Sequence, residues 1–258
     1  MTGMATIIRS NEELFEQYHR LGAGDVVVGR IRLRSGEEHL LLDLVSRGVR
    51  LIPSALSQLC SRSKVFQARL LARYMVPGTT AVYDRHDLLS LVTDYGQAGT
   101  GAVVCKLDQA NGGQGILYFR SVEDLYNQAV LATLPYPFVV QPFVAGARDV
   151  RAVLLGDRLD AYERCNQGNF RQNLHCGGTS SPYSLSPEQL AFCREVMARA
   201  DFPYGHLDLL ISPDDDWYLS EINLRGGLRG AAISQQDYLA ATEMIHGQEL
   251  TRLLDDSE

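Results

Sequence analysis

The stretch 206–223 reads HLDLLISPDDDWYLSEIN, two apolar segments separated by a proline and three aspartates. This pattern predicts an antiparallel hairpin, because a polar turn joins two runs of strand-forming residues. A turn centred between residues 214 and 215 places Asp208 opposite Glu221, and Asn223 then lies on the same face as Glu221. Facing carboxylates are costly when buried unless a cation lies between them, and oxygen ligands of this kind suit Mg²⁺.

The alternative is that both acids point to solvent from a half-exposed sheet. Their neighbours are apolar on both faces of the two strands, which favours a buried position. We therefore predict a metal site formed by Asp208, Glu221 and Asn223, whereas residues 214–216 are expected to form only a polar turn.

Lysine is nearly absent from the chain: of 24 cationic residues 22 are arginine, and the only lysines are Lys64 and Lys106. GC-rich codon usage accounts for the bias but not for the two lysines that remain. A compact ammonium on a flexible stem contacts phosphate in a way that a planar guanidinium does not reproduce. The two lysines are therefore candidate phosphate contacts.

Lys106 ends a predicted strand and precedes the loop LDQANGGQG, which contains Gly112, Gly113 and Gly115. Glycines let backbone amides approach phosphate oxygens closely. The order differs from a P-loop, in which the lysine follows the glycines and opens a helix. An ordinary hairpin loop is the alternative interpretation of this segment.

The segment GNFRQNLHCGG at 168–178 concentrates polar side chains in a loop. Arg171 and Asn173 lie two positions apart, and beside a metal pair they could hold a transferring phosphoryl group. The alternative is a polar surface loop, in which His175 only forms local hydrogen bonds and Cys176 has no chemical role.

The 258 residues carry a net charge of −7, which excludes general nucleic-acid binding because no long basic run exists. No apolar run approaches the roughly 18 to 20 residues of a membrane helix, and no signal peptide is recognised, so we expect a cytoplasmic protein without a membrane segment. The five cysteines are odd in number and scattered, which argues against a disulfide framework or a structural zinc site.

The element pattern predicts an α+β protein with three lobes. Residues 1–60 are expected to form a parallel α/β lobe, 61–140 a small α+β lobe and 141–258 a larger one. The expected elements are strands at 5–9, 25–29, 49–52, 79–83, 102–106, 116–119, 138–141, 150–155, 159–165, 206–212 and 217–223, helices at 11–21, 37–46, 62–75 and 86–95, a helix after Ser121, a helix opened by Ser186, and a loop at 166–185.

Several of these segments together resemble the ATP-grasp superfamily, most closely its RimK-type branch of carboxylate-amine ligases. In chain order they are Lys64, Lys106 with its glycine-rich loop, VVQPFV at 139–144, RDVRAVLLGDRLDAYERC at 148–165, GNFRQNLHCGG at 168–178, HLDLL at 206–210 and SEINLRGG at 220–227. The likeness covers roughly 62–232. It implies an ATP-grasp fold, in which two α+β subdomains grip ATP, preceded here by a short parallel α/β lobe.

The resemblance also implies roles for individual residues. Lys106, Arg171 and Asn173 would be catalytic, and Asp208, Glu221 and Asn223 would bind the metal. The implied nucleotide contacts are Lys64 and Lys106 on the phosphates, Gly112, Gly113, Gln114 and Gly115 in a mobile flap, Gln141, Pro142, Phe143 and Val144 beside adenine, Asp149 near the ribose, and Arg171, Gln172 and Asn173 at the end where phosphoryl is transferred.

The chain departs from the branch in three places. Pro142 has no N–H, so the amide of Val144 must donate to adenine. Leu224-Arg225-Gly226-Gly227 replaces the family's usual A-S-P-G or S-S-P-G, which affects the expected substrate. The first lobe, of about 60 residues, is also shorter than is usual in the branch.

We therefore expect an ATP-dependent ligase that forms an amide or peptide bond through an acyl phosphate. Its cofactors would be ATP and Mg²⁺, with Mn²⁺ as a substitute. Its partners would be a small-molecule or peptide carboxylate and an amine, and a protein acceptor or a homo-oligomer stays open. The alternatives are a catalytically reduced ATP-binding or sensing protein and a phosphotransferase on the same scaffold.

Overall fold

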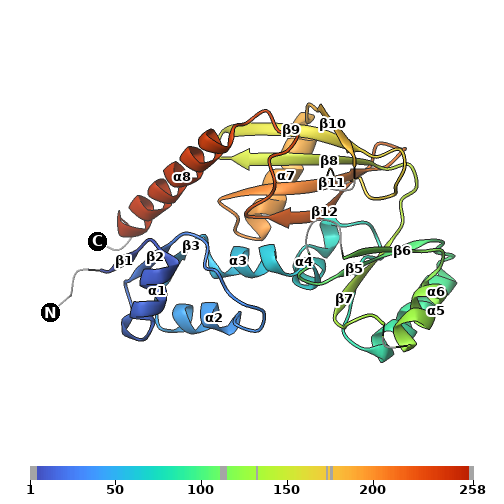
Figure 1. The fold of residues 1–258 in the computed structure, drawn as a ribbon, viewed down its shortest axis with the longest axis horizontal. Helices are drawn as coiled ribbons and strands as arrows, with labels where there is room; N and C mark the ends of the chain where they lie inside the picture. Colours follow the sequence, from blue (N-terminus) through green and yellow to red (C-terminus); the bar gives the residue numbers. More distant parts are fainter. Residues whose placement is uncertain (1–4, 111–114, 132, 173, 175–176, 256–258) are drawn as a thin grey trace.

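The computed structural model describes residues 5–110, 115–131, 133–172, 174 and 177–255. Its described elements form three sheets with helices packed on them (Figure 1). The predicted α+β class is confirmed.

The first sheet is parallel, with the order β1-β2-β3, and it forms the N-terminal lobe. The predicted alternation of strands and helices is confirmed here. The Ser10 hydroxyl caps the first helix by accepting from the Glu13 amide, and Gly48, with φ +83°, follows the second. The elements are β1 (Ile7–Ile8), α1 (Asn11–Gln17), β2 (Val26–Val28), α2 (His39–Ser46) and β3 (Arg50–Ile52).

Two short helices, α3 (Ala55–Arg62) and α4 (Lys64–Leu70), connect this lobe to the rest of the chain. The helix predicted over 62–75 is present but shorter, since α4 ends at Leu70, and α3 was not predicted. Ser63 has extended backbone angles and caps α4 by accepting from the Phe66 amide, so α4 begins after it as a helix separate from α3. A 3₁₀ turn at Ala72–Tyr74 follows α4.

The second sheet is antiparallel with the order β4-β7-β5-β6. Helices α5 and α6 pack against it, and Leu88, Leu125 and Phe138 are fully buried in the shared core. Its elements are β4 (Thr80–Val82), α5 (Arg85–Gln97), β5 (Val103–Leu107), β6 (Ile116–Phe119), α6 (Val122–Val130) and β7 (Phe138–Pro142).

The third sheet, β10-β9-β8-β11-β12, is also antiparallel and carries the largest core. The predicted hairpins at 150–165 and 206–223 and the capping box of Ser186 with Gln189 are confirmed. A short strand at Thr179–Pro182 lies within the predicted loop 166–185. The elements are β8 (Arg148–Leu155), β9 (Arg158–Cys165), β10 (Thr179–Pro182), α7 (Pro187–Arg199), β11 (Tyr204–Ile211) and β12 (Trp217–Asn223).

A 21-residue helix, α8 (Gln235–Asp255), ends the described chain and was not predicted. It runs from beside the large sheet to the first lobe (Figure 1), where Leu250 packs with Val26, Val28 and Ile52. The C-terminal helix therefore helps to fix the first lobe against the large sheet. None of the described helices is long and apolar enough to cross a membrane.

The hydrophobic cores do not correspond one to one to the three predicted lobes. The first lobe and the second sheet have clusters of their own, but Val65, Leu71 and Tyr74 join the core of the large sheet. The lobe boundaries near residues 60 and 140 stay a prediction.

Candidate active site

The two acids of the last hairpin are cross-strand partners, as predicted. The turn and the register next to it differ from the prediction. Asp208 pairs with Glu221 and His206 with Asn223. Near the turn, however, Ile211 pairs with Trp217, so the turn is centred on residue 214 and the predicted centre was wrong. A β-bulge after Asp208 restores the expected pairing, because β12 contributes one extra residue, Ser220.

Both lysines reach the bulged end of this hairpin. Lys64, the first residue of α4, forms an ion pair with Glu221 (Nζ to Oε1, 3.1 Å) and donates to the Ala110 carbonyl at 2.7 Å. Lys106, on β5, donates to the carbonyl and to the hydroxyl of Ser220, each at 3.1 Å. The side chains of Lys64 and Lys106 are buried, so two ammonium groups converge beside Glu221.

Burial lowers the pKa of Lys106 from its ordinary 10.5 to about 8. The charge of Glu221 opposes this shift, and the neighbouring charge of Lys64 adds to it. A buried cation whose charge is costly in this fold favours a polyanionic ligand as its partner.

Asp208 is 8% exposed and is held by two arginines. Arg151 donates to it through two nitrogens, at 2.6 and 2.8 Å, and Arg164 lies 3.0 Å away. Burial alone would raise the pKa of Asp208, but the two guanidinium groups outweigh burial and hold it well below its usual range. Arg164 also donates to Asp149 at 2.7 Å, so the guanidinium bridges two acids.

Arg171 lies where the segment after β9 approaches the start of β6. It donates through two nitrogens to the Ile116 carbonyl, at 3.1 and 2.5 Å, and its guanidinium lies 4.4 Å from the centre of the Phe170 ring. Gly115 fits tightly here, since a Cβ would overlap Ala110. Gly112, Gly113, Gln114, Asn173, His175 and Cys176 lie outside the described residues.

The segment expected beside adenine carries an unused acceptor. Gln141 is 3% exposed, and its Oε1 has no hydrogen-bond partner in the part of the chain that the structure describes. The Phe143 amide donates to the Ala102 carbonyl at 2.9 Å, which leaves the Val144 amide as the next donor. Pro142 belongs to β7 and pairs with Val103.

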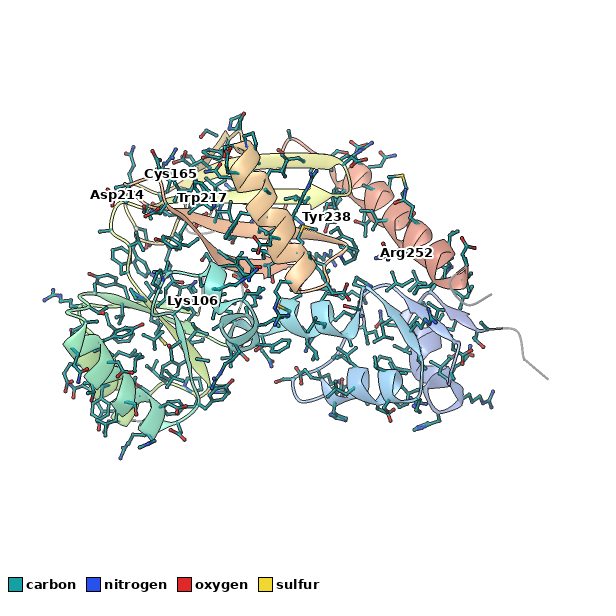
Figure 2. All side chains as sticks on the ribbon, turned by 180° about the vertical axis from the view of Figure 1, so that it is seen from behind. Lys106, Cys165, Asp214, Trp217, Tyr238 and Arg252 are labelled. Atoms are coloured by element: carbon teal, nitrogen blue, oxygen red, sulfur yellow. The ribbon has the colours of Figure 1, made fainter. Side chains whose placement is uncertain are left out.

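One cleft of about 1010 Å³ brings most of the predicted residues together. Figure 2 shows Lys106 where the second sheet meets the large one. The predicted residues that line the cleft are Lys64, Lys106, Gln141, Phe143, Val144, Asp149, Arg171, Gln172, Asp208, Glu221 and Asn223, whereas Gly115 and Pro142 are not among its lining residues.

Of the eight arginines that line the cleft, only Arg171 was predicted from the sequence as a site residue. Arg151 and Arg164 lie on the neighbouring strands β8 and β9, and Arg151 is the direct cross-strand partner of Asp208. The sequence positions of Arg151 and Arg164 do not indicate that they contact Asp208. Only the order of the strands β9, β8 and β11 in the sheet brings the three side chains together. In total ten lysines and arginines line the cleft, against four acids. The cleft is therefore cationic in a protein whose net charge is −7.

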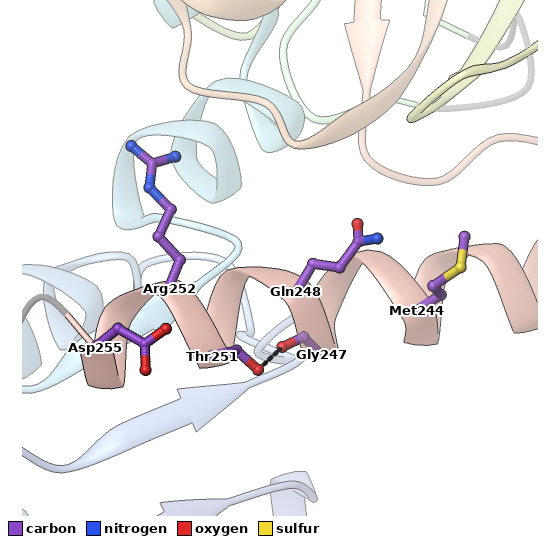
Figure 3. Close-up of a pocket in the computed structure, with 6 residues that line it drawn as sticks. All are labelled: Met244, Gly247, Gln248, Thr251, Arg252 and Asp255. Atoms are coloured by element: carbon purple, nitrogen blue, oxygen red, sulfur yellow. Dashed lines mark hydrogen bonds between the residues drawn. The ribbon is translucent and has the colours of Figure 1, made fainter.

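A second hollow, of about 650 Å³, lies along α8 (Figure 3). All of its lining residues come from that one helix, among them Met244, Gln248 and Arg252. It is an open surface without converging polar groups from other elements. The large cleft is the candidate active site.

The comparisons with known proteins identify the family and the fold. A family model described as RimK-like ATP-grasp domain matches residues 61–246. A probable alpha-L-glutamate ligase of Trichodesmium erythraeum is 30% identical over 177 residues, covering 66% of this chain and 58% of that protein. The corresponding protein of Sodalis glossinidius is 31% identical over 198 residues, covering 72% and 63%. The chain thus spans less than two thirds of the length of these curated relatives.

Solved structures show the fold. The D-cycloserine synthetase DcsG has a TM-score of 0.60 at 15% identity, covering 94% of this chain and all of that one. The D-alanine-D-alanine ligase from Coxiella burnetii has a TM-score of 0.61 at 14% identity, covering 91% and 71%. The chain belongs to the RimK-like ATP-grasp family.

Proposed function

We propose that this protein is an ATP-dependent carboxylate-amine ligase. A substrate carboxylate attacks the γ-phosphate of ATP, which gives an acyl phosphate and ADP. An amine then attacks the acyl carbon, forms the amide and releases phosphate. The observation that carries this proposal is that both lysines of the chain enter one cleft beside the facing pair Asp208 and Glu221.

The cleft suits a nucleotide base at its Gln141 end. The Gln141 Oε1 is a buried acceptor without a partner among the described residues, and the exocyclic amine of adenine is a donor of the required kind. The neighbouring Val144 amide would donate to a ring nitrogen, because Pro142 has no N–H and the Phe143 amide is already used. This supports adenine recognition by backbone and amide groups.

The acids suit a divalent cation that keeps some of its water. Among the described residues no group of three or more His, Cys, Asp and Glu side chains is arranged to hold a metal. Asp208, Glu221 and Asn223 would supply only oxygens, which is the donor set of Mg²⁺ bound jointly by protein, phosphate and water. The bound ion would neutralise phosphate charge and the charge that develops during transfer.

The counter-ions of the two acids would exchange partners when the nucleotide binds. Glu221 is paired with Lys64 and Asp208 with Arg151 in the structure. Phosphate oxygens can accept from the same cations, which leaves the carboxylate oxygens for the metal. Lys106 and Arg171 would contact the transferring phosphoryl group, where fixed cations stabilise the transition state by several kcal/mol, of order 3 per donor.

The names of the relatives make glutamate the first substrate to test. We propose amino acids or peptides as the acid and the amine. ADP formation would be measured with Mg²⁺ across a panel of acids with and without amines, and the product mass would identify the bond formed.

The expected result is ADP formation that requires an acid, loss of at least 100-fold in Glu221→Gln, and full activity in the control Arg158→Gln, whose side chain is exposed and outside the cleft. ADP formation driven by a polyol instead would support the phosphotransferase, and nucleotide binding without turnover would support a sensing role. Either outcome would refute the ligase.

A further inference from the structure

The strand that carries Glu221 and Asn223, β12, lies at the edge of the five-stranded sheet. Along such an edge the backbone groups of alternate residues point away from the sheet. Side chains from other elements bind three successive positions of this edge. They are Lys106 on the Ser220 carbonyl (3.1 Å), Gln67 on both backbone groups of Ile222, and Ser61 on the Leu224 amide (3.0 Å). Side chains thus take the place of a further strand.

Gln67 makes the middle contact with both ends of its side-chain amide. Its Oε1 accepts from the Ile222 amide at 3.0 Å, and its Nε2 donates to the Ile222 carbonyl at 2.9 Å. The same Nε2 donates to the Cys60 carbonyl at 2.8 Å. Gln67 is 1% exposed, so bulk water does not compete for these hydrogen bonds. Ile222 is therefore bound as a neighbouring strand would bind it.

Ile222 lies between two of the proposed metal ligands. Its side chain is fully buried in the core, whereas Glu221 and Asn223 point to the opposite face and line the cleft. The Ile222 amide belongs to the peptide unit that joins it to Glu221, and its carbonyl belongs to the unit that joins it to Asn223. Because Gln67 binds both groups, it holds the backbone on both sides of Ile222 and so fixes where the two ligands begin.

The helix that carries Gln67 also carries Lys64. The two residues are three positions apart on α4, so their side chains lie on the same face of the helix. From that face Lys64 forms its ion pair with Glu221 at 3.1 Å. One turn of α4 therefore sets the separation between a proposed phosphate contact and the proposed metal ligands.

We propose that Gln67 is a positioning residue of the metal site, which holds Glu221 and Asn223 in the geometry that the cation needs beside Lys64. The inference rests on the proposed ligase function and adds a residue that is not among those lining the cleft. Replacing a buried group that orients metal ligands changes metal affinity by about 10-fold to 100-fold. Loss of Gln67 should therefore weaken metal binding although every ligand is still present.

Gln58 offers a matched control. It is also a buried glutamine, 2% exposed, and its amide likewise binds two backbone groups. It accepts from the Ile31 amide at 2.8 Å and donates to the Pro53 carbonyl at 2.7 Å. These bonds hold the first lobe, and Gln58 is not among the residues lining the cleft. Gln58→Met and Gln67→Met therefore remove the same chemistry at two places, of which only the second adjoins the metal ligands.

The test measures how much a metal strengthens nucleotide binding, and it does not need turnover. Calorimetric titrations would give the dissociation constant of a non-hydrolysable ATP analogue in EDTA and in saturating Mn²⁺, at the same ionic strength. The ratio of the first constant to the second is the metal factor. Gln67→Met should lower the metal factor about 10-fold or more, while the affinity in EDTA stays within about 2-fold of the wild type. Gln58→Met should keep the metal factor within about 2-fold.

Urea unfolding shows whether a change in the metal factor is local. Both methionine variants should unfold at a lower urea concentration, because each leaves buried backbone groups without partners. If Gln67→Met does not fold, Gln67→Ala and its match Gln58→Ala replace the pair, since the space left by the shorter side chain lets water bind the freed groups. The metal factor is expected to fall in Gln67→Ala as in Gln67→Met.

The outcomes separate the positioning role from the ligase. If the Gln67 variants keep the metal factor of the wild type, or if the Gln58 variants lose as much of it, the positioning role is refuted and the ligase stands. If the factor falls only in the Gln67 variants but no acid stimulates ADP formation, the ligase is refuted and the positioning role stands. A wild type whose nucleotide binding Mn²⁺ does not strengthen would refute the metal site and the positioning role together, and ADP formation would then decide on the ligase.

Discussion

Replacing Lys106 by methionine should make the nucleotide-free protein more stable while it removes the proposed ligase activity. The side chain is 7% exposed, and the shift of its pKa from 10.5 to about 8 corresponds to a cost of about 3 kcal/mol for the charged form at neutral pH. The variant also loses two hydrogen bonds to Ser220, at about 1 kcal/mol each at most. The expected net gain is therefore about 1 to 2 kcal/mol at pH 7.

The gain should depend on pH with a definite sign. Below pH 8 the lysine is charged in both the folded and the unfolded chain, so the folded protein carries the full cost. Between about pH 8 and pH 10.5 the folded chain releases the proton first, and the wild type gains stability as the pH rises. The difference between Lys106→Met and the wild type should shrink across this window.

Urea unfolding at pH 7 and at pH 10 measures this difference directly. Lys64→Met is the matched control, because Lys64 forms an ion pair with Glu221 and its removal should lower stability or leave it unchanged. A Lys106→Met protein that is less stable than the wild type at pH 7, or a gap that does not change with pH, would refute the reasoning. Retained ADP formation in the variant would separately refute the phosphate contact.

Four further predictions use the same cleft. Glu221→Gln should cost about 1 to 2 kcal/mol in urea unfolding, since the Glu221 side chain is partly exposed and Lys64 keeps its hydrogen bond to the Ala110 carbonyl, so that a much larger loss of ADP formation reports chemistry. Asp208→Asn should lower stability by about 3 kcal/mol or more, because it removes the buried counter-charge of two arginines; an unchanged unfolding midpoint would contradict this. Gly226→Ala should destabilise by about 1 to 3 kcal/mol through overlap with the His206 ring, whereas Gly227→Ala, with open space around it, should be nearly neutral, and equal melting temperatures would exclude the overlap. Burial lowers the pKa of His206 to about 4 from 6.5, so stability should fall by up to about 3 kcal/mol as the pH drops from 6.5 to 4, and this fall should be smaller in His206→Asn.

The elements that the sequence predicts well are those with local signals. Ser186, Pro187 and Gln189 start α7 where expected, and Gly156 joins the predicted hairpin of β8 and β9. These features need only a few neighbouring residues, because caps and tight turns satisfy backbone groups locally.

Helix α8 was missed because its reason to form is not local. Its buried residues are few for its length, namely Tyr238, Ala241, Ile245 and Leu250. Leu250 packs on strands that lie about 200 positions earlier in the chain, and no periodicity in the helix itself reveals that partner. The cap, in which the Ser234 hydroxyl accepts from the Asp237 amide, is the signal that could have located its start.

The residues of the candidate site also fall into two groups, those with a signal in the local sequence and those that only the fold brings together. That Lys64, Lys106, Asp208 and Glu221 lie in one cleft could be predicted, because their residue types are unusual for their surroundings in the sequence. Arg151 could not, since it meets Asp208 only through the pairing of β8 with β11. The neighbours that determine the charge of a buried acid come from strand order, which a single sequence does not specify.

Because of the bulge at Ser220, the predicted pairing of Asp208 with Glu221 is correct although the predicted centre of the turn is not. The turn is centred on residue 214, and continuing that register without a bulge would place Asp208 opposite Ser220 and Glu221 opposite Leu207. Glu221 would then share the face of Leu207, which is fully buried in the apolar core. The extra residue returns Glu221 to the face of Asp208, and the same residue offers two oxygens to Lys106. One local irregularity thus brings both acids and a lysine to the same end of the cleft, which is why a register shift here would separate the proposed metal ligands from the proposed phosphate contacts.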